Sequence, residues 1–233
     1  MRNDHEDAAP RRALFVAGTD TGIGKTHTAC ALLHAFAARG ERAVGMKPVA
    51  SGCLETPDGL RSEDAQALQA ASVGEWPYPR INPVALRAPL SPHLAAAQDG
   101  VRIELDALRE SFDWLRERAD RVVVEGVGGW LAPLAADCPA AAIAQRWNLP
   151  VVLVVGMRLG CLNHALLSAR AIRADGCVLA GWIANRVDPA MDAFAGNLAT
   201  LDALLDAPRL GVLPHGADPR AAAAMLDLAA LAA

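Results

Sequence analysis

A glycine-rich segment near the N-terminus has the residue types that bind phosphate. It spans residues 18–26 (GTDTGIGKT), between a short apolar run and a helical pattern. A turn of this kind directs backbone N–H groups and the positive end of the following helix at an anion. Lys25 can reach the β- and γ-phosphates of a nucleotide, and the Thr26 hydroxyl can bind Mg²⁺. Five residues rather than four separate Gly18 from Gly24, so the general phosphate-loop spacing is missed by one residue.

Lysine is rare in this chain, and both lysines are expected at the same edge of a sheet. Of the 22 Lys and Arg residues, only Lys25 and Lys47 are Lys, and the other 20 are Arg. Lys47 lies in the segment MKPVASG, at the same expected edge of a sheet as the glycine-rich turn. A compact ammonium ion there could neutralise the charge on a transferring phosphoryl group. The alternative is a solvated loop lysine, which the shared location of the two lysines disfavours.

Two acidic residues stand out, and one of them is a candidate metal ligand. Glu125 ends the apolar run RVVVE and precedes the segment GVGGW, which contains Gly126, Val127 and Gly128. An acid at the carboxyl end of a strand beside a phosphate loop suits a Walker-B role. The alternative is a turn whose acid is solvated. Asp64, judged by its local sequence alone, is a helix-start acid stabilised by the helix dipole.

Three further segments follow apolar runs and could contact a ligand. Residues 160–163 (GCLN) open a helix and form a potential anion site, although an ordinary strand–helix connection is the favoured alternative. Asn185 and residues 214–216 (PHG) lie where a nucleotide base could be recognised. The six histidines show no metal spacing, and His27 and His34 are interpreted as structural.

The elements that position these residues alternate between strands and helices. Strands are predicted at 13–17, 43–46, 121–125, 151–155, 179–184 and 210–213, and helices at 26–39, 63–71, 105–119, 140–147, 164–175, 191–205 and 220–231. Apolar strands alternating with helices predict one α/β domain over 13–233, with a parallel sheet covered by helices on both faces. Residues 48–92 are expected to be a long functional insertion with a single helix, 63–71.

Composition excludes several classes of protein. The chain has 233 residues, a net charge of -4, 53% hydrophobic and 21% charged residues, so it is not disordered. The mild acidity argues against nucleic acid as a partner, and no apolar run reaches the roughly 18–20 residues of a membrane helix. Residues 1–12 are predicted to be a frayed tail rather than a signal or transit peptide. Five widely spaced cysteines predict neither disulfides nor a zinc site, and favour a cytoplasmic location.

Five segments together resemble the ATP-dependent dethiobiotin synthetases of biotin biosynthesis. They are residues 15–26 (FVAGTDTGIGKT), 45–52 (GMKPVASG), 124–130 (VEGVGGW), 155–165 (VGMRLGCLNHA) and 181–185 (GWIAN). The resemblance runs collinearly from residue 13 to 213, and that family uses the same spacing in its phosphate loop. It implies a homodimer with a P-loop NTPase-type fold. It also implies that 7,8-diaminononanoate, CO₂ and ATP give dethiobiotin, ADP and phosphate, through a carbamate and a carbamic-phosphoric anhydride.

The resemblance also implies roles for individual residues. Lys25 and Lys47 would be catalytic, and Thr26, Asp64 and Glu125 would hold Mg²⁺. The nucleotide would contact Gly22, Ile23, Gly24, Lys25, Thr26, Gly126, Val127 and Gly128, with Asn185, Arg186, Pro214, His215 and Gly216 on the adenine side. The substrate would contact Thr21 and Ser51 at its carbamate end, and Gly160, Cys161, Leu162 and Asn163 of the partner protomer at its carboxylate end. Gly22 departs from the family, which often has Glu there, and the chain is less alike after Pro214.

Two alternatives belong to other functional classes. One is a P-loop ATPase switch that acts through a partner protein and whose ATP turnover does not depend on a diamine. The other is an amide-forming ligase acting on a larger acid, a type that commonly carries an added glutaminase domain.

Overall fold

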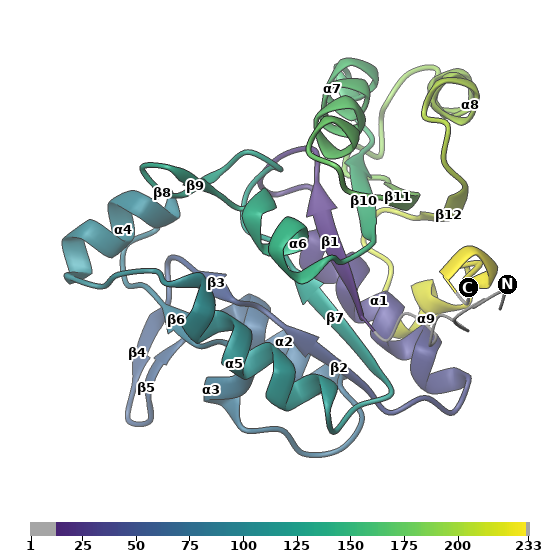
Figure 1. Cartoon of the computed structure of the whole chain (residues 1–233). Helices are drawn as coiled ribbons and strands as arrows, with labels where there is room; N and C mark the ends of the chain where they lie inside the picture. The colour runs from purple at the N-terminus through teal and green to yellow at the C-terminus, as the bar shows by residue number, and fades with distance from the viewer. Residues whose placement is uncertain (1–12, 232–233) are drawn as a thin grey trace, which may run out of the picture.

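Six apolar runs form the parallel strands of one central sheet. The computed structural model describes residues 13–231, and within them this sheet has the order β12-β11-β10-β1-β7-β2 (Figure 1). Its strands are β1 (Ala13–Gly18), β2 (Ala43–Met46), β7 (Arg121–Glu125), β10 (Val151–Gly156), β11 (Leu179–Asn185) and β12 (Arg209–Leu213). Each differs from its predicted range by at most one residue at either end. The predicted α/β fold with one parallel sheet is therefore confirmed.

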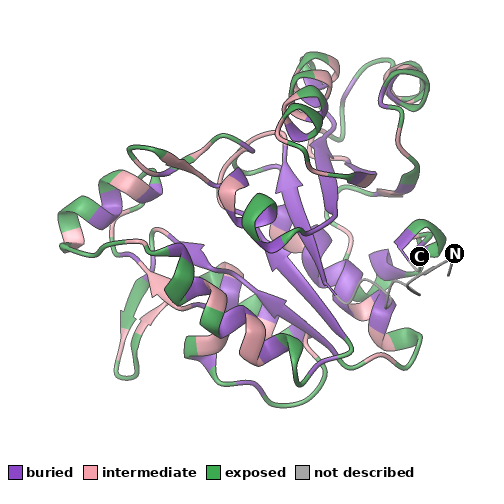
Figure 2. Cartoon of the chain, viewed as in Figure 1, coloured by how far each residue is buried: buried purple, intermediate pink, exposed green. Residues whose placement is uncertain are grey.

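Helices cover both faces of this sheet, as predicted. One face is packed by α1 (Lys25–Ala38), α2 (Glu63–Ala71) and α9 (Pro219–Ala223). The other is packed by α5 (Leu105–Arg116), α6 (Ala141–Trp147), α7 (Cys161–Ala174) and α8 (Phe194–Leu204). The strands β1, β7 and β10 are buried along their whole length (Figure 2). Burial on both faces explains why these runs are continuously apolar rather than alternating.

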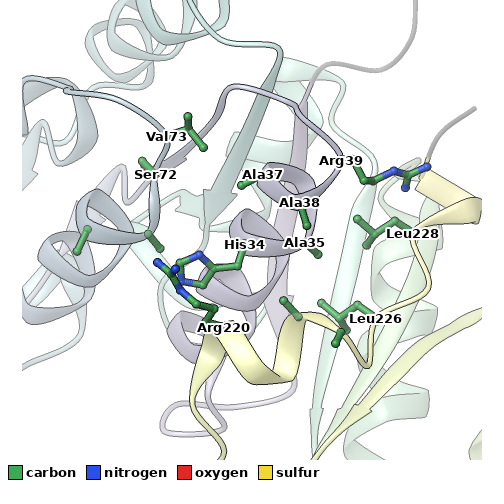
Figure 3. A pocket seen from close by; sticks show the side chains of 14 residues that line it. His34, Ala35, Ala37, Ala38, Arg39, Ser72, Val73, Arg220, Leu226 and Leu228 are labelled. Atoms are coloured by element: carbon green, nitrogen blue, oxygen red, sulfur yellow. The ribbon is translucent and has the colours of Figure 1, made fainter.

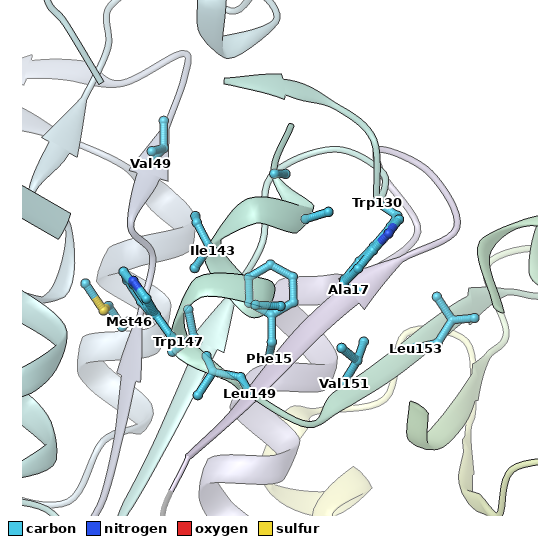
Figure 4. Close-up of a cluster of buried hydrophobic side chains, with 14 of the residues drawn as sticks. Phe15, Ala17, Met46, Val49, Trp130, Ile143, Trp147, Leu149, Val151 and Leu153 are labelled. Atoms are coloured by element: carbon cyan, nitrogen blue, oxygen red, sulfur yellow. The ribbon is translucent and has the colours of Figure 1, made fainter. Parts of the chain in front are cut away.

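Aromatic side chains fill the core between β1 and α6. Phe15 of β1 lies edge-on to Trp130, with ring centroids 6.1 Å apart, and Trp147 of α6 stacks on Phe112 at 4.7 Å. Figure 4 shows Phe15 among Ile143 and other apolar side chains of this cluster. Trp130 follows β7 by a few residues, so the core holds the glycine-rich connection close to the first strand.

The segment 48–92 is more structured than predicted. Besides α2 it contains the short strands β3 (Val49–Ala50), β4 (Leu54–Thr56), β5 (Gly59–Arg61) and β6 (Val84–Ala85), the helix α3 (Tyr78–Ile81), and the start of α4 (Pro92–Asp99). β3 pairs with β6, and β4 with β5. The expectation of a single helix was wrong because two- and three-residue strands show no measurable periodicity. The hairpin of β8 (Pro133–Ala135) and β9 (Cys138–Pro139) was missed for the same reason.

The predicted helix 220–231 is also wrong. α9 ends at Ala223, and only a short 3₁₀ turn, η1 (Ala229–Leu231), follows. Between them the backbone pairs with the edge of the sheet, because Leu226 bridges to Gly211 and the Asp227 N–H donates to the Leu210 carbonyl at 2.7 Å. Alanine-rich composition favours a helix locally, but pairing with an open strand edge determines the observed structure. Smaller boundary shifts affect α5, α7 and α8, and the predicted tail 1–12 lies outside the described residues.

Other expectations can be compared directly with the structure. All five cysteines are free, as predicted. In the part of the chain that the structure describes, no helix is long and apolar enough to cross a membrane.

A hollow of about 550 Å³ lies along the C-terminal half of α1, between the end of α2 and α9. Figure 3 shows that His34 of α1 and Arg220 of α9 both reach into this hollow.

Candidate active site

The register of the sheet brings distant residues together at its carboxyl edge. Met46 of β2 pairs with Val124 of β7, and the next residues along the two strands are Lys47 and Glu125. Glu125 in turn pairs with Val16 of β1, which leads into the phosphate loop. Parallel pairing therefore places both lysine-bearing segments beside the same carboxylate.

Lys47 is the centre of a buried charge cluster. Its Nζ lies 2.6 Å from Glu125 Oε1 and 2.9 Å from Asp64 Oδ2, and it also donates to the Gly126 carbonyl at 3.3 Å. Lys47 and Glu125 are almost wholly buried, whereas the Asp64 side chain is 46% exposed. Burial acts to lower the pKa of Lys47, but attraction by Glu125 and Asp64 outweighs it and raises that pKa. The ammonium therefore stays charged.

The two carboxylates respond differently to this environment. Burial raises the pKa of Glu125, against the attraction of Lys47. Burial also acts to raise the pKa of Asp64, but Lys47 and a hydrogen bond with Thr26 outweigh it, so the pKa is lowered. Opposite shifts in two neighbouring acids, in a cleft, are typical of functional sites.

Backbone packing determines where Lys47 and Asp64 lie. A Cβ at Gly45 would come within 2.8 Å of Leu68, so the absence of a side chain there lets α2 approach β2 closely. Asp64 stands in the first turn of α2, which begins after the N-cap Ser62. Asn82, which sequence reasoning missed, donates its side-chain amide to the Lys47 carbonyl at 2.8 Å. The local prediction of Asp64 as a helix-start acid and its location in the cluster are thus compatible.

The phosphate loop holds its lysine against its own backbone. Lys25 Nζ donates to the Asp20 carbonyl at 2.9 Å, and Thr26 Oγ1 donates to Glu125 Oε1 at 2.9 Å. Burial and the nearby Lys47 lower the pKa of Lys25 to about 8, against the attraction of surrounding acids. Gly24 precedes α1 with a φ of 83°, a left-handed conformation that favours glycine.

A cleft of about 980 Å³ opens over this cluster. Its predicted lining residues are Thr21, Gly22, Gly24, Lys25, Thr26, Lys47, Ser51, Asp64, Glu125, Val127 and Gly128. Its other lining residues were not predicted as site residues; they are Pro89, Leu90, Ser91, Pro92, Leu94, Gly129, Ala132 and Pro133. Gly129 lies in the glycine-rich segment that follows Glu125, whereas no local signal marks the others. Pro92 and Leu94 belong to α4, which packs against β8, where Pro133 lies.

The residues that could hold Mg²⁺ are compatible with that ion. Thr26, Asp64 and Glu125 offer one hydroxyl and two carboxylates, the hard oxygen ligands that Mg²⁺ prefers. Glu125 Oε2 is buried and has no hydrogen-bond partner within residues 13–231, so one carboxylate oxygen is available. Two carboxylates and a hydroxyl do not complete an octahedron, so water and nucleotide phosphate oxygens would supply the remaining ligands.

Other predicted residues lie at the same edge of the sheet but outside this cleft. Asn185 ends β11, and its side-chain amide donates to the Ile23 carbonyl at 2.8 Å, against the phosphate loop. Arg186 follows, and its carbonyl lies 3.2 Å from His215 Nδ1 in the predicted segment Pro214–Gly216. The structure therefore brings Asn185, Arg186 and His215 together beside the loop.

The predicted carboxylate-binding segment forms the start of α7. Gly160 is the N-cap of this helix, with a φ of 95°, and Cys161, Leu162 and Asn163 form the first turn. None of these four residues is among the described residues that line the cleft. An ion pair missed by sequence reasoning joins this region to the phosphate loop, with Arg158 Nη2 2.5 Å from Asp20 Oδ2.

Comparisons with known proteins give consistent results. The chain matches a protein-family model described as an AAA domain over residues 12–222. The ATP-dependent dethiobiotin synthetase BioD of Xanthomonas oryzae pv. oryzae (strain PXO99A) is 56% identical over 211 residues, which cover 91% of this chain and 94% of that protein. The protein of the same name from Aromatoleum aromaticum (strain DSM 19018 / LMG 30748 / EbN1) is 53% identical over 219 residues, or 93% of this chain and 97% of that protein.

Solved structures support the fold alone. The signal recognition particle 54 kDa protein from Aeropyrum pernix K1, in complex with GDP, has a TM-score of 0.50 and 17% identity. The match covers 96% of this chain and 48% of that one, so this chain spans about half of its length. The receptor FtsY from Elizabethkingia anophelis, in complex with GDP, also gives a TM-score of 0.50, with 18% identity over 91% of this chain and 59% of that one.

Proposed function

The chain belongs to the family of ATP-dependent dethiobiotin synthetases, and from this premise we propose that it converts 7,8-diaminononanoate, CO₂ and ATP into dethiobiotin, ADP and phosphate. It is then an ATP-dependent cyclo-ligase of biotin biosynthesis. The observation that carries the proposal is the buried cluster of Lys47 with Glu125 and Asp64, beside Lys25 and inside a cleft that can hold a small molecule.

The proposed reaction brings two anions together, the carbamate and the γ-phosphate of ATP. Their mutual repulsion explains why the site needs positively charged side chains. One amine of the substrate takes up CO₂ and loses a proton, forming a carbamate. A carbamate oxygen then attacks the γ-phosphorus of ATP, and ADP leaves. The second amine closes the ureido ring on the carbamate carbon and expels phosphate. Lys25 and Lys47 supply positive charge where the carbamate and the γ-phosphate meet, in a site where burial strengthens electrostatic effects.

Other residues of the cleft would orient the reactants. Thr21 and Ser51 both line the cleft, and Ser51 Oγ is buried without a hydrogen-bond partner in the described part of the chain. We assign both hydroxyl groups to the carbamate end of the substrate. Thr26, Asp64 and Glu125 would hold Mg²⁺, which, when bound, neutralises charge on phosphate oxygens. The phosphates themselves would lie on backbone N–H groups of Gly22 to Thr26, at the start of α1.

The adenine end of ATP and the carboxylate end of the substrate are assigned to segments outside the cleft. Asn185, Arg186 and the segment Pro214–Gly216 are proposed for the adenine side, with Gly126, Val127 and Gly128 beside the phosphates. Gly160 to Asn163 would bind the substrate carboxylate of the partner protomer in a homodimer, because the first turn of a helix offers free N–H groups to an anion. The five free cysteines support a cytoplasmic location for the enzyme.

An omission assay tests this function. The purified protein is incubated with ATP, Mg²⁺, bicarbonate as the source of CO₂, and the diamine, with each component left out in turn, and the product is identified by mass spectrometry. We expect dethiobiotin only in the complete mixture. ATP hydrolysis at an unchanged rate without the diamine would instead support an ATPase switch. The amide-forming ligase would consume ATP with a larger acid and ammonia and leave the diamine unreacted.

A further inference from the structure

The cleft above the lysines has a charged end and an apolar wall. Lys25, Lys47, Asp64 and Glu125 supply its charged lining, and one segment supplies its apolar wall, which consists of Pro89, Leu90, Pro92 and Leu94, with Ser91 between them. Leu90 and Leu94 of this wall are 41% and 49% exposed. Single exposed leucines are common on protein surfaces. Here two of them line the same cleft as the reactive groups, together with Pro89 and Pro92.

Backbone hydrogen bonds hold this wall in place. The Gly52 N–H donates to the Ala88 carbonyl at 3.0 Å, and the Leu90 N–H donates to the same carbonyl at 2.8 Å. A Cβ at Gly52 would come within 3.2 Å of Pro89, so the two segments are in close contact. Gly52 directly follows Ser51 in the Lys47 segment. The wall is therefore attached to the same stretch of chain that carries the catalytic lysine.

Other residues that line the cleft are also low in polarity. They are Val127 and Ala132, in the connection that follows β7, and Pro133, the first residue of β8. The helix α4, which begins at Pro92, buries Ala95 and Ala96 and packs against β8. Apart from the charged residues and the glycines, most of the side chains that line the cleft are therefore aliphatic. A ligand with a polar head and a hydrocarbon chain fits this distribution of charge.

We propose that Leu90 and Leu94 bind the hydrocarbon chain of the diamine and determine which chain length the enzyme accepts. This inference rests on the proposed function, because it takes the reacting amines to lie at Lys47. Each buried methylene group contributes about 0.8 kcal/mol, or roughly fourfold in affinity. Truncation of either leucine to Ala should therefore weaken binding of the nine-carbon diamine by about tenfold, while the head of the substrate remains in place.

Binding measurements with two diamines test the proposal. Leu90→Ala and Leu94→Ala are compared with the wild type by isothermal titration with 7,8-diaminononanoate and with 2,3-diaminobutane, which has the same amine pair without the chain. Leu54→Ala is the matched control, because Leu54 is 61% exposed on β4 and is not among the residues lining the cleft. We expect about tenfold weaker binding of the long diamine to both cleft variants and wild-type binding to the control.

Two outcomes of these binding measurements would overturn the proposal. Wild-type affinity of both cleft variants for the long diamine would show that the wall does not contact the chain. Equal weakening for both diamines would show that the leucines act on the amine end, which also contradicts the proposal. If the short diamine binds too weakly to measure, the long diamine alone decides. Failure of the proposed function is a separate result, since the wild-type protein would then form no dethiobiotin in the omission assay.

Discussion

Lys47 is held in a position that suits an ammonium group better than a guanidinium. Its Nζ has a carboxylate on two sides, at 2.6 and 2.9 Å, and a backbone carbonyl at 3.3 Å. The side chain is almost wholly buried, and these three oxygen atoms surround its head group. A planar, forked guanidinium would have to displace Asp64 or Glu125, both of which are proposed metal ligands.

We therefore predict that Lys47→Arg is nearly as damaging as Lys47→Ala. Loss of one such contact in a phosphoryl-transfer site lowers the rate by about 10²–10³. Steady-state kinetics of both variants would measure this loss, with thermal unfolding as a check that they remain folded. Arg87→Lys, an exchange in an exposed ion pair, is the control and should keep wild-type turnover. Near-normal turnover of Lys47→Arg would mean that the site requires a positive charge but not the shape of the ammonium group.

Predictability at this scale depends on whether a residue belongs to a recognisable motif or follows a recognisable strand. Lys25 and Thr26 could be predicted from the glycine-rich segment between β1 and α1, whereas Lys47 and Glu125 could be predicted because each stands at the end of an apolar strand. The contact of Asn82 with the Lys47 carbonyl could not be found, since it depends on how α3 packs against β2. The apolar wall of the cleft was missed for a similar reason.

At the scale of elements, the phosphate loop depends on two glycines that differ in their surroundings. Gly22 and Gly24 have φ values of 72° and 83°, so both disfavour a side chain. A Cβ at Gly22 would meet nothing within 4 Å, whereas a Cβ at Gly24 would lie 2.1 Å from Asn185 Nδ2. Comparison of the two positions therefore separates the effect of backbone strain from that of a steric conflict with the Asn185 side chain.

We predict that Gly24→Ala weakens ATP binding far more than Gly22→Ala. The alanine at position 24 must displace the side-chain amide of Asn185, which would then lose its hydrogen bond to the Ile23 carbonyl of the loop. Gly22→Ala adds only strain of about 1 kcal/mol, or a few-fold in affinity. Isothermal titration with ATP would compare the two variants. Similar losses in both would indicate that strain alone accounts for the requirement for glycine.

The contact of α1 with α9 contains a histidine that should affect acid stability. Burial, and then the nearby Arg220, lower the pKa of His34, against the attraction of Asp218. Because the folded pKa is below the unfolded value, the unfolded chain takes up the proton first. Stability is therefore unaffected above the unfolded pKa and is lost as the pH falls through about 6.5.

Replacement of His34 should reduce this loss. We expect His34→Gln to give a shallower decrease in the free energy of unfolding between about pH 7 and pH 5 than the wild type. Arg220→Gln should act in the same direction, since it removes the repulsion that disfavours the imidazolium. Urea denaturation at several pH values measures the slopes. A slope in His34→Gln as steep as that of the wild type would contradict the assignment.

Elements with a clear apolar run or helix-start signal could be predicted from the sequence, whereas two- and three-residue strands could not. The helix α2 was predicted with its observed bounds, because Ser62 and the acids that follow are a strong helix start. The failure at residues 220–231 has a tertiary cause, since that backbone pairs with β12 after Ala223. Local propensity describes a segment in isolation and does not include a neighbouring strand edge.

At the scale of the whole molecule, the proposed homodimer shares its active sites. Lys47 would act in the site of its own protomer, whereas Asn163, at the start of α7, would act in the site of the partner. Asn163 is exposed, and an acidic residue is compatible with the first turn of a helix, so Asn163→Asp should fold normally. It should nevertheless repel the substrate carboxylate.

Mixing two inactive variants tests the shared site. We predict that co-refolded Lys47→Ala and Asn163→Asp proteins recover roughly a quarter of wild-type activity, because heterodimers contain one intact site and one doubly damaged site. Each variant refolded alone is the control and should stay inactive. A mixture that demonstrably exchanges subunits and still shows no activity would mean that each site is built from one chain.

The central claim is that a carbamate made from CO₂ is phosphorylated at the lysine cluster. Transfer of isotopic oxygen measures this step directly. In a single turnover started with ¹⁸O-labelled CO₂, too brief for exchange with water, attack by a carbamate oxygen places that oxygen between carbon and phosphorus. Ring closure then leaves it on the phosphate. We predict inorganic phosphate carrying one ¹⁸O and dethiobiotin carrying the other, as read by mass spectrometry. Labelled dethiobiotin formed together with unlabelled phosphate would contradict the account.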